Sequence, residues 1–319
     1  MKKLILLLLL LLLCFSLIGE TLTPEKSYSL ISENKTGSYL GLERPGEYPV
    51  VFSEDFKSRK ESVEFALTMT PDGKEIYFTR RKEGTFDNRI FVTREVNGHW
   101  NEPVVAGFTR NAWANEPSIT PDGKKLYFGS KLSPDGSTTE RKNAAIWVAE
   151  RQGNRFGPAI HFEDGLMYVS VSRSGTMFVT DKSGNWPLIV KKNFIEGRYG
   201  KSEQVIGPNR QFYAAWHPYI APDESYIIFE QIGRKNNTHG ADDLFISFKD
   251  RHGKWTPVKN MGTTINSKAT EFCPYVSPDG KYLFFTRYTS EKNSDIYWVD
   301  AAIIDRMRHE TLKKEGSDR

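Results

Sequence analysis

Cysteine is scarce in this chain of 319 residues. The two cysteines are Cys14, which lies in an apolar segment near the N-terminus, and Cys273. Once that segment is removed, Cys273 has no partner, and no intramolecular disulfide framework is available. The sequence therefore predicts a fold that is stabilised by packing.

An excess of charge of either sign is also absent. The sequence has 44 Lys and Arg residues against 40 Asp and Glu, a formal net charge of +4 at pH 7. This balance argues against a nucleic-acid-binding surface or a polybasic membrane patch, so no nucleic acid partner is expected. A content of 38% hydrophobic and 26% charged residues is typical of a globular protein.

Long hydrophobic runs are missing after the N-terminus. The run over residues 4–15 follows Lys2 and Lys3 and is shorter than the roughly 20 apolar residues of a membrane span. This pattern predicts a signal peptide over residues 1–19, no integral membrane span after its removal, and an exported protein that is periplasmic or extracellular. A lipoprotein anchor at Cys14 is less favoured, because Leu13 stands where a lipidation signal requires a small residue. The cleavage site stays open.

The sequence contains one unit in five copies. Each copy has a turn sequence followed by a hydrophobic strand, as in Pro71-Asp72-Gly73-Lys74 before Glu75-Ile76-Tyr77-Phe78-Thr79. The turns begin at positions 71, 121, 173, 222 and 278, so the spacings are 50, 52, 49 and 56 residues. Self-similarity at such a period indicates a repeat architecture.

The Pro-Asp-Gly sequence predicts a tight hairpin turn. Pro restricts φ, Asp caps the turn with its side chain, and Gly takes the left-handed position. The fourth copy has Glu224 in the glycine position. We expect this residue to cost on the order of 1 kcal/mol if the same turn forms there.

Each unit contains four strand signals. One strand precedes the turn, one follows it, and a third comes after a variable loop. The fourth carries an aromatic-Pro signature, as in Trp100-Asn101-Glu102-Pro103-Val104. Four antiparallel strands make one propeller blade. The sequence therefore predicts an all-β fold, a β-propeller of five four-stranded blades, with six blades as the alternative if residues 21–61 form more than one strand.

The two ends of the chain are expected to close the propeller. The fifth unit stops after its third strand at Asp300, and Tyr48-Pro49-Val50-Val51-Phe52 matches the missing fourth strand. Pairing the two ends hides sheet edges. The predicted organisation is an N-terminal extension over 20–47, a propeller over 48–300, and a short C-terminal helix with a polar tail over 301–319.

The repeated unit resembles a known family. Pro-Asp-Gly-Lys before an Ile/Leu-Tyr-Phe strand, with a later Asp-Ile/Leu-aromatic strand, is similar to the PD40, or WD40-like, propeller repeat of the TolB family. The similarity spans residues 48–300 and implies an exported bacterial protein of mostly unassigned activity. TolB has an additional N-terminal α/β domain, for which the residues before Tyr48 are too few, so a role in the Tol system is not implied.

Candidate site residues follow from aligning the turns. Propellers bind ligands near the central channel, where the innermost strands meet. Five residues before the turns stand Ala66, Glu116, Tyr168, His217 and Cys273, and seven before them stand Glu64, Ala114, Leu166, Ala215 and Glu271. Strand alternation puts both sets on equivalent faces. We therefore expect a ligand-binding channel mouth formed by Glu64, Glu116, Tyr168, His217 and Glu271, with Trp216, which stands beside His217, as a ring for a sugar or peptide to stack on.

The chemistry of this set leaves several roles open. Three carboxylates and an imidazole can bind a divalent cation, perform acid–base work, or hydrogen-bond neighbouring blades. No catalytic residue is assigned, since the sequence contains no nucleophile elbow, phosphate-binding loop or HExxH zinc motif. Cys273 is interpreted as a buried, inert thiol. The sequence requires no cofactor.

Two hypotheses for the function remain. The first is an exported, monomeric binding protein that presents its blade loops or channel mouth to a protein, peptide or glycan of the cell envelope. The second is a polysaccharide hydrolase or lyase that uses channel carboxylates. The first is our prediction, and a solvent-open pair of channel carboxylates flanked by Trp would favour the second.

Overall fold

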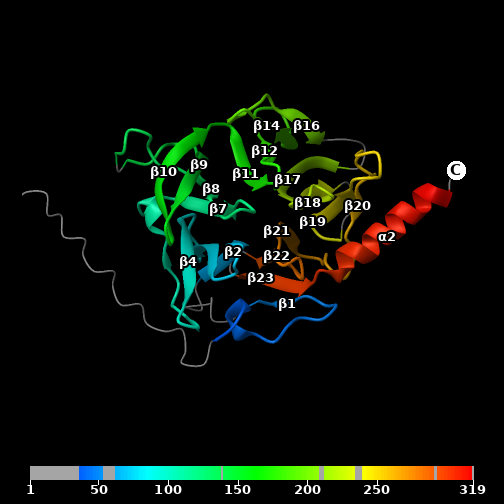
Figure 1. The fold of residues 1–319 in the computed structure, drawn as a ribbon, viewed down its shortest axis with the longest axis horizontal. Coiled ribbons are helices and arrows are strands. Elements are labelled where there is room, and N and C mark those ends of the chain that lie inside the picture. The colour runs from blue at the N-terminus through cyan, green and yellow to red at the C-terminus, as the bar shows by residue number, and fades with distance from the viewer. Residues whose placement is uncertain are drawn as a thin grey trace, which may run out of the picture.

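A computed structural model describes residues 36–52, 62–137, 139–207, 212–233, 239–290 and 293–317. Five antiparallel sheets surround a central axis and form a five-bladed β-propeller (Figure 1). The predicted fold class is confirmed, with five blades rather than six. The predicted signal peptide lies outside the described residues. Among the residues that are described, no helix has both the length and the apolar character needed to cross a membrane.

The first two blades follow the predicted strand order. From the axis outward, blade 1 comprises β2 (Ser62–Met69), β3 (Glu75–Lys82) and β4 (Asn88–Val96), and its outer position is shared by β5 (His99–Trp100) and β6 (Val104–Val105). Blade 2 comprises β7 (Ala114–Ile119), β8 (Lys125–Ser130), β9 (Ala145–Gln152) and β10 (Arg155–Glu163), and the 3-10 turn η3 (Gly107–Thr109) precedes it.

The remaining blades repeat this arrangement. Blade 3 comprises β11 (Leu166–Val171), β12 (Met177–Asp181), β13 (Leu188–Lys192) and β16 (Glu203–Ile206), with an additional hairpin of β14 (Phe194–Ile195) and β15 (Arg198–Tyr199). Blade 4 comprises β17 (Phe212–Ile220), β18 (Tyr226–Gly233), β19 (Asp242–Phe248) and β20 (Lys259–Asn260). Blade 5 comprises β21 (Thr270–Val276), β22 (Tyr282–Ser290), β23 (Asn293–Asp300) and β1 (Val50–Val51).

The chain ends close blade 5 as predicted. Strand β1 pairs antiparallel with β23, Val50 opposite Trp298. Phe52 packs edge-on against Trp298, with ring centroids 5.1 Å apart, and Leu40, in the 3-10 turn η1 (Tyr39–Gly41), is buried in the same cluster. The N-terminal segment therefore covers the junction of blades 5 and 1 and leaves no open seam there.

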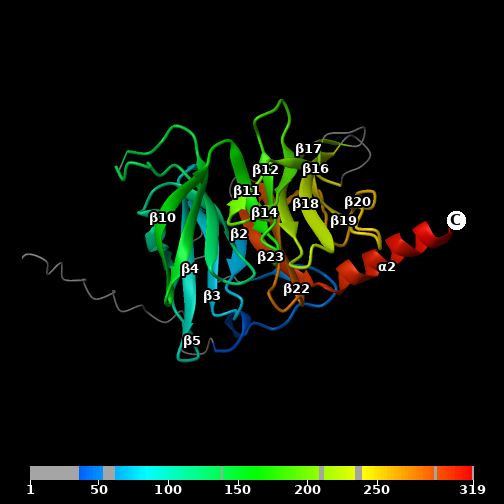
Figure 2. The same cartoon turned by 45° about the horizontal axis from the view of Figure 1, so that its top comes forward.

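Helix α2 (Ala302–Ser317) follows the last strand. The helix confirms the prediction of a short C-terminal helix, and its first turns pack Ile303, Ile304 and Met307 against blades 4 and 5. The C-terminal part extends away from the propeller (Figures 1 and 2).

The hydrophobic core lies between the blades. Each pair of neighbouring blades shares one cluster of buried side chains, for example Tyr77, Phe128 and Trp147 between blades 1 and 2. Blades therefore pack face to face, and their inner strands are held around a channel.

The repeated turn is built as the sequence predicts. In blade 1, Thr70 Oγ1 donates to Asp72 Oδ1 (2.6 Å), the Lys74 amide donates to the same oxygen (3.0 Å), and Gly73 has φ of 69°. The side-chain bond recurs in blades 2 and 5 as Thr120–Asp122 and Ser277–Asp279.

The turn of blade 4 differs because Glu224 replaces glycine with φ of 60°. Its carboxylate accepts hydrogen bonds from Ser172 (2.9 Å), Ser174 (2.8 Å) and Lys249 (2.7 Å). Two of these donors belong to the turn of blade 3. The expected cost of the left-handed residue is thus offset by bonds that tie two blades together.

Candidate functional site

Every innermost strand has a β-bulge at the same position. The bulges interrupt the register of β2, β7, β11, β17 and β21. The left-handed residues there are Ala66, Glu116, Tyr168, His217 and Cys273, with φ of 52°, 53°, 61°, 46° and 50°. These are the five residues that the turn alignment placed in one set. A bulge changes the direction of a side chain, and here it turns five equivalent side chains to the channel.

Two of the bulges are stabilised by hydrogen bonds from their backbone amides to threonine side chains of the preceding blade. The Ala66 amide donates to Thr286 Oγ1 (3.1 Å), and the Glu116 amide donates to Thr79 Oγ1 (2.8 Å). Both threonines occupy the same position in the second strand of their blades. Left-handed backbone costs a non-glycine residue roughly 1–2 kcal/mol, so these inter-blade bonds offset part of the strain.

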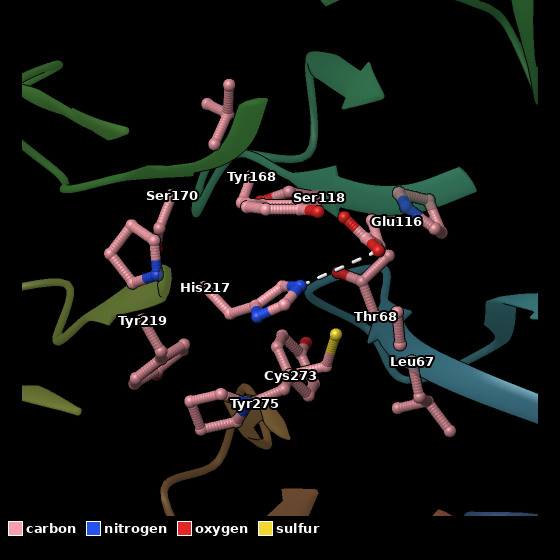
Figure 3. Close-up of a pocket in the computed structure, with 15 residues that line it drawn as sticks. Leu67, Thr68, Glu116, Ser118, Tyr168, Ser170, His217, Tyr219, Cys273 and Tyr275 are labelled. Atoms are coloured by element: carbon pink, nitrogen blue, oxygen red, sulfur yellow. Dashed lines mark ion pairs between the residues drawn. The ribbon is translucent and has the colours of Figure 1, made fainter. Parts of the chain in front are cut away.

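Three of the five side chains converge. Figure 3 shows Glu116, His217 and Cys273 pointing toward one another from β7, β17 and β21, and their ligand atoms lie within 4.8 Å of each other. His217 Nε2 is 3.6 Å from Glu116 Oε1. Tyr168 covers the imidazole, with ring centroids 3.8 Å apart. At this position of the channel, blades 2, 3, 4 and 5 thus each contribute one side chain that carries a polar or titratable group, and blade 1 contributes the small side chain of Ala66.

A neighbouring carboxylate orients the imidazole. His217 Nδ1–H donates to Glu230 in β18, so Nε2 faces Glu116. Glu230 is not among the site residues predicted from the sequence, although a signal was present. The equivalent positions in the other units hold Thr79, Gly129, Thr180 and Thr286, and a charged residue among small ones marks this position as unusual.

Burial and neighbouring charges shift the pKa values of His217, Glu116 and Cys273. Burial disfavours the imidazolium, but Cys273 and the Glu230 and Glu116 carboxylates surround it, and the net effect raises the pKa of His217 well above its usual value. Burial raises the pKa of the Glu116 carboxyl. Burial also raises the pKa of the Cys273 thiol to about 12. In the ligand-free protein, Cys273 is a neutral thiol beside a charged His217.

The three-residue cluster lies between two compartments of the channel. The outer one, which we call the mouth cavity, has a volume of about 320 Å³ and is lined by Glu116, Tyr168, His217 and Glu230 together with Arg81, Asn88, Asn115 and several aromatic rings. The next compartment inward is about 50 Å³ and has Glu116, His217 and Cys273 in its wall. A third cavity of about 190 Å³ lies toward the Pro-Asp-Gly turns. Glu116 and His217 therefore form the floor of the mouth cavity, and Cys273 lies in the wall of the smaller compartment.

Four buried polar atoms that belong to residues lining the mouth cavity make no hydrogen bond to any described residue. They are Asn88 Oδ1, Asn115 Oδ1, Glu116 Oε2 and His217 Nε2. Buried polar groups in folded proteins are normally paired. Their concentration in the residues around one cavity makes this cavity the candidate ligand site.

The structure brings together only part of the predicted site set. Glu116, Tyr168 and His217 meet, whereas Glu64 and Glu271 form buried ion pairs with Arg80 (2.7 Å) and Arg287 (2.8 Å) of their own blades. These two glutamates line none of the three channel cavities. Regular alternation would place Glu64 on the same face as Ala66, and Glu271 on the same face as Cys273. This regularity is broken because the bulge inserts an extra residue into the strand.

Two further residues singled out in the sequence have clear positions. Trp216 is half-buried and packs edge-on against Tyr168, with ring centroids 6.0 Å apart. It lines none of the three channel cavities. Cys273, interpreted from sequence as an inert thiol, is buried as expected but belongs to the convergent cluster.

Comparison with known proteins supports the fold. No protein-family model matches the chain, and no curated protein matches it. Among solved structures, TolB from Acinetobacter baumannii has 15% identity and a TM-score of 0.46, with 74% of this chain and 54% of TolB covered. A GH43 endo-arabinanase from Bacillus licheniformis has 13% identity and a TM-score of 0.44, with 74% and 92% covered. A glycoside hydrolase has 9% identity and a TM-score of 0.51, with 82% and 93% covered.

These similarities concern the fold alone. The chain spans about half the length of the TolB chain that it matches. The glycoside hydrolase with a TM-score of 0.51 shares the fold, and membership of the PD40 family stays a prediction from the repeat sequence.

Proposed function

We propose that this protein is an exported binding propeller that takes a small polar ligand of the cell envelope, most suitably the end of a glycan chain, into the mouth cavity. The observation that carries the proposal is the group of four unpaired buried atoms in residues that line one cavity. A cavity of about 320 Å³ is near the lower limit for small-molecule sites and suits one sugar unit.

The chemistry of the cavity favours hydroxyl groups. Three of the unpaired atoms are acceptors, from Asn88, Asn115 and Glu116, and the charged His217 supplies a donor. A sugar hydroxyl both donates and accepts, so it matches this mixture better than a carboxylate, which only accepts. Phe65, Phe272 and Tyr288 add apolar rings to the wall, on which a sugar ring can pack.

The alternative, a polysaccharide hydrolase or lyase, gains no specific support. Two of the three carboxylates on which it was based, Glu64 and Glu271, are neutralised by Arg80 and Arg287. The third, Glu116, has an imidazole beside it. A carboxylate pair on either side of a scissile bond is what such chemistry needs, and these residues do not form one.

The proposal is tested by titrating the protein with cell-wall and plant oligosaccharides in a calorimeter. Asn88→Ala removes one unpaired acceptor and should weaken binding about tenfold, the effect of losing one good hydrogen bond. Asn154→Ala, in the exposed turn between β9 and β10, is the matched control and should bind like wild type.

A second pair of variants tests the charged acceptor. Glu116→Gln should weaken binding by about tenfold or more, and the exposed Glu150→Gln should not. Binding that survives both Asn88→Ala and Glu116→Gln unchanged would place the ligand elsewhere on the molecule.

A further inference from the structure

We infer that Glu116, His217 and Cys273 form a binding site for one divalent transition metal ion, with zinc as the best fit. The three residues come from blades 2, 4 and 5 and offer one oxygen, one nitrogen and one sulfur atom. This inference shares Glu116 Oε2 and His217 Nε2 with the proposed glycan site, but its test needs neither Asn88 nor an oligosaccharide, so the two proposals can fail separately.

The donor set selects the class of metal. Thiolate and imidazole ligands suit zinc and other borderline-soft ions, whereas magnesium and calcium prefer oxygen alone. Zinc binds sulfur at about 2.3 Å and nitrogen or oxygen at about 2.0–2.2 Å. In a tetrahedral site the ligand atoms therefore lie about 3.3–3.8 Å apart. The three atoms now lie within 4.8 Å of each other, so small side-chain rotations bring them to that spacing.

The residues around the cluster match the surroundings of known zinc sites. A metal-binding histidine almost always donates its other ring N–H to a carboxylate, carbonyl or water. His217 does so through Nδ1 to Glu230, and the same bond directs Nε2 to the cluster. Glu116 Oε2 and His217 Nε2 are buried and make no hydrogen bond to the described residues. Both atoms are thus available to a metal.

Three protein ligands leave one coordination position. Glu116 and His217 line both the mouth cavity and the smaller compartment, and Cys273 lines the smaller one, so the fourth position is open to the channel. Three protein ligands with an open fourth position distinguish catalytic or ligand-binding zinc from closed structural zinc. On binding, the metal replaces the proton on Nε2 and the thiol proton of Cys273, and both protons leave to solvent.

The competing explanation is a metal-free ion pair between Glu116 and His217 beside an unreactive thiol. A cobalt titration separates the two. In a Cys14→Ser background Cys273 is the single thiol of the chain, so a thiolate-to-cobalt charge-transfer band must come from Cys273. We expect one Co²⁺ per chain, with this band and the visible absorption of tetrahedral cobalt, and displacement by one Zn²⁺. No band at saturating Co²⁺ overturns the inference.

Variants identify the ligands. Cys273→Ser should abolish the charge-transfer band, His217→Gln should reduce zinc affinity at least about tenfold, and Glu230→Gln, which removes the orienting carboxylate, should reduce it about 10- to 100-fold. His161→Gln is the control, since His161 lies in β10, outside the channel, beside Asp164, and it should bind like wild type. Circular dichroism excludes variants that fail to fold, and the wild-type spectrum decides the question without them. Equal zinc binding in wild type, Cys273→Ser and His217→Gln would show that the metal binds elsewhere.

Discussion

His217 donates its Nδ1–H to Glu230 in the next strand of the same blade, and this bond directs Nε2 across the channel toward Glu116 of another blade. The side chains of all three residues are almost completely buried. The bond therefore determines which atoms the protein presents at the floor of the mouth cavity.

Removing one member of the buried pair of His217 and Glu230 should destabilise the folded protein. We expect Glu230→Ala to lower the free energy of unfolding by about 3 kcal/mol, because the imidazolium then lacks its partner. A double-mutant cycle with His217→Ala should give a coupling energy of about 1–3 kcal/mol. Urea denaturation measures both. Glu310→Ala, in the exposed pair with Lys259, is the control and should cost less than about 1 kcal/mol; a similar cost for both changes would refute the special role of Glu230.

The backbone strain at the bulges can be tested at Ala66, because its side chain has no polar or titratable group. Ala66 is left-handed with φ of 52°, a conformation that glycine adopts without strain. We expect Ala66→Gly to be neutral or to stabilise the protein by up to about 1 kcal/mol. Ala149→Gly, at an equally buried position of regular strand β9, should destabilise it by about 0.5–1 kcal/mol. Thermal unfolding distinguishes them, and equal losses in both variants would mean that position 66 is not strained.

The fold was predictable because the sequence repeats it. The turn residues define the first hairpin of each blade, and four spacings of similar length leave little freedom in strand order. The closure was predictable as well, because Val50 and Val51 match a strand that the fifth unit lacks. Local signals and the global fold agree at these positions.

The site was predictable only in part, because the bulge has no sequence signature. Ala, Glu, Tyr, His and Cys occupy its left-handed position in the five blades. Counting from the turn found these residues, but assuming regular alternation placed Glu64 and Glu271 with them. The arginines that neutralise these glutamates stand 16 residues later in both cases, Arg80 and Arg287. That repeated spacing was the available signal for a structural ion pair.

The closure of the propeller depends on Phe52. Its ring is 1% exposed and packs against Phe284 and Trp298. Phe52→Ala should lower the free energy of unfolding by about 3–5 kcal/mol through the lost burial and the cavity left behind. Tyr48→Ala, four residues earlier and 75% exposed, should change it by less than about 0.5 kcal/mol. Equilibrium unfolding in urea gives both values, and a loss below about 1 kcal/mol for Phe52→Ala would show that closure does not need this ring.

The ionisation of Glu224 in the turn of blade 4 should make the stability of the protein depend on pH in the acid range. Burial alone would raise the pKa of Glu224, but hydrogen bonds from Lys249, Ser174 and Ser172 outweigh it and lower the pKa from 4.5 to about 2. A lowered pKa in the folded state gives stability that is present above pH 4.5 and is lost as the pH falls toward 2.

Glu224→Gln should therefore be less stable than wild type at pH 7 by about 1 kcal/mol, and the difference should shrink between pH 4.5 and pH 2. Glu203→Gln, whose partner Lys191 is also a lysine but whose side chain is 54% exposed, is the control. A difference that stays constant over this range would contradict the assignment.

Asp242 should make the stability of the protein fall as the pH rises toward neutral, which is the opposite of the effect of Glu224. Burial, and then the nearby Glu230, raise the pKa of Asp242 from 3.8 to about 7. The folded protein keeps this proton over a range in which the unfolded chain has lost it, so stability should fall as the pH rises from about 4 to about 7. Asp242→Asn cannot ionise and should remove this slope, and it should be more stable than wild type at pH 8. Urea unfolding at pH 5, 6, 7 and 8 measures the effect, with the exposed Asp305→Asn of helix α2 as a control that keeps the wild-type slope. Parallel curves for wild type and Asp242→Asn would mean that Asp242 is already ionised at pH 5.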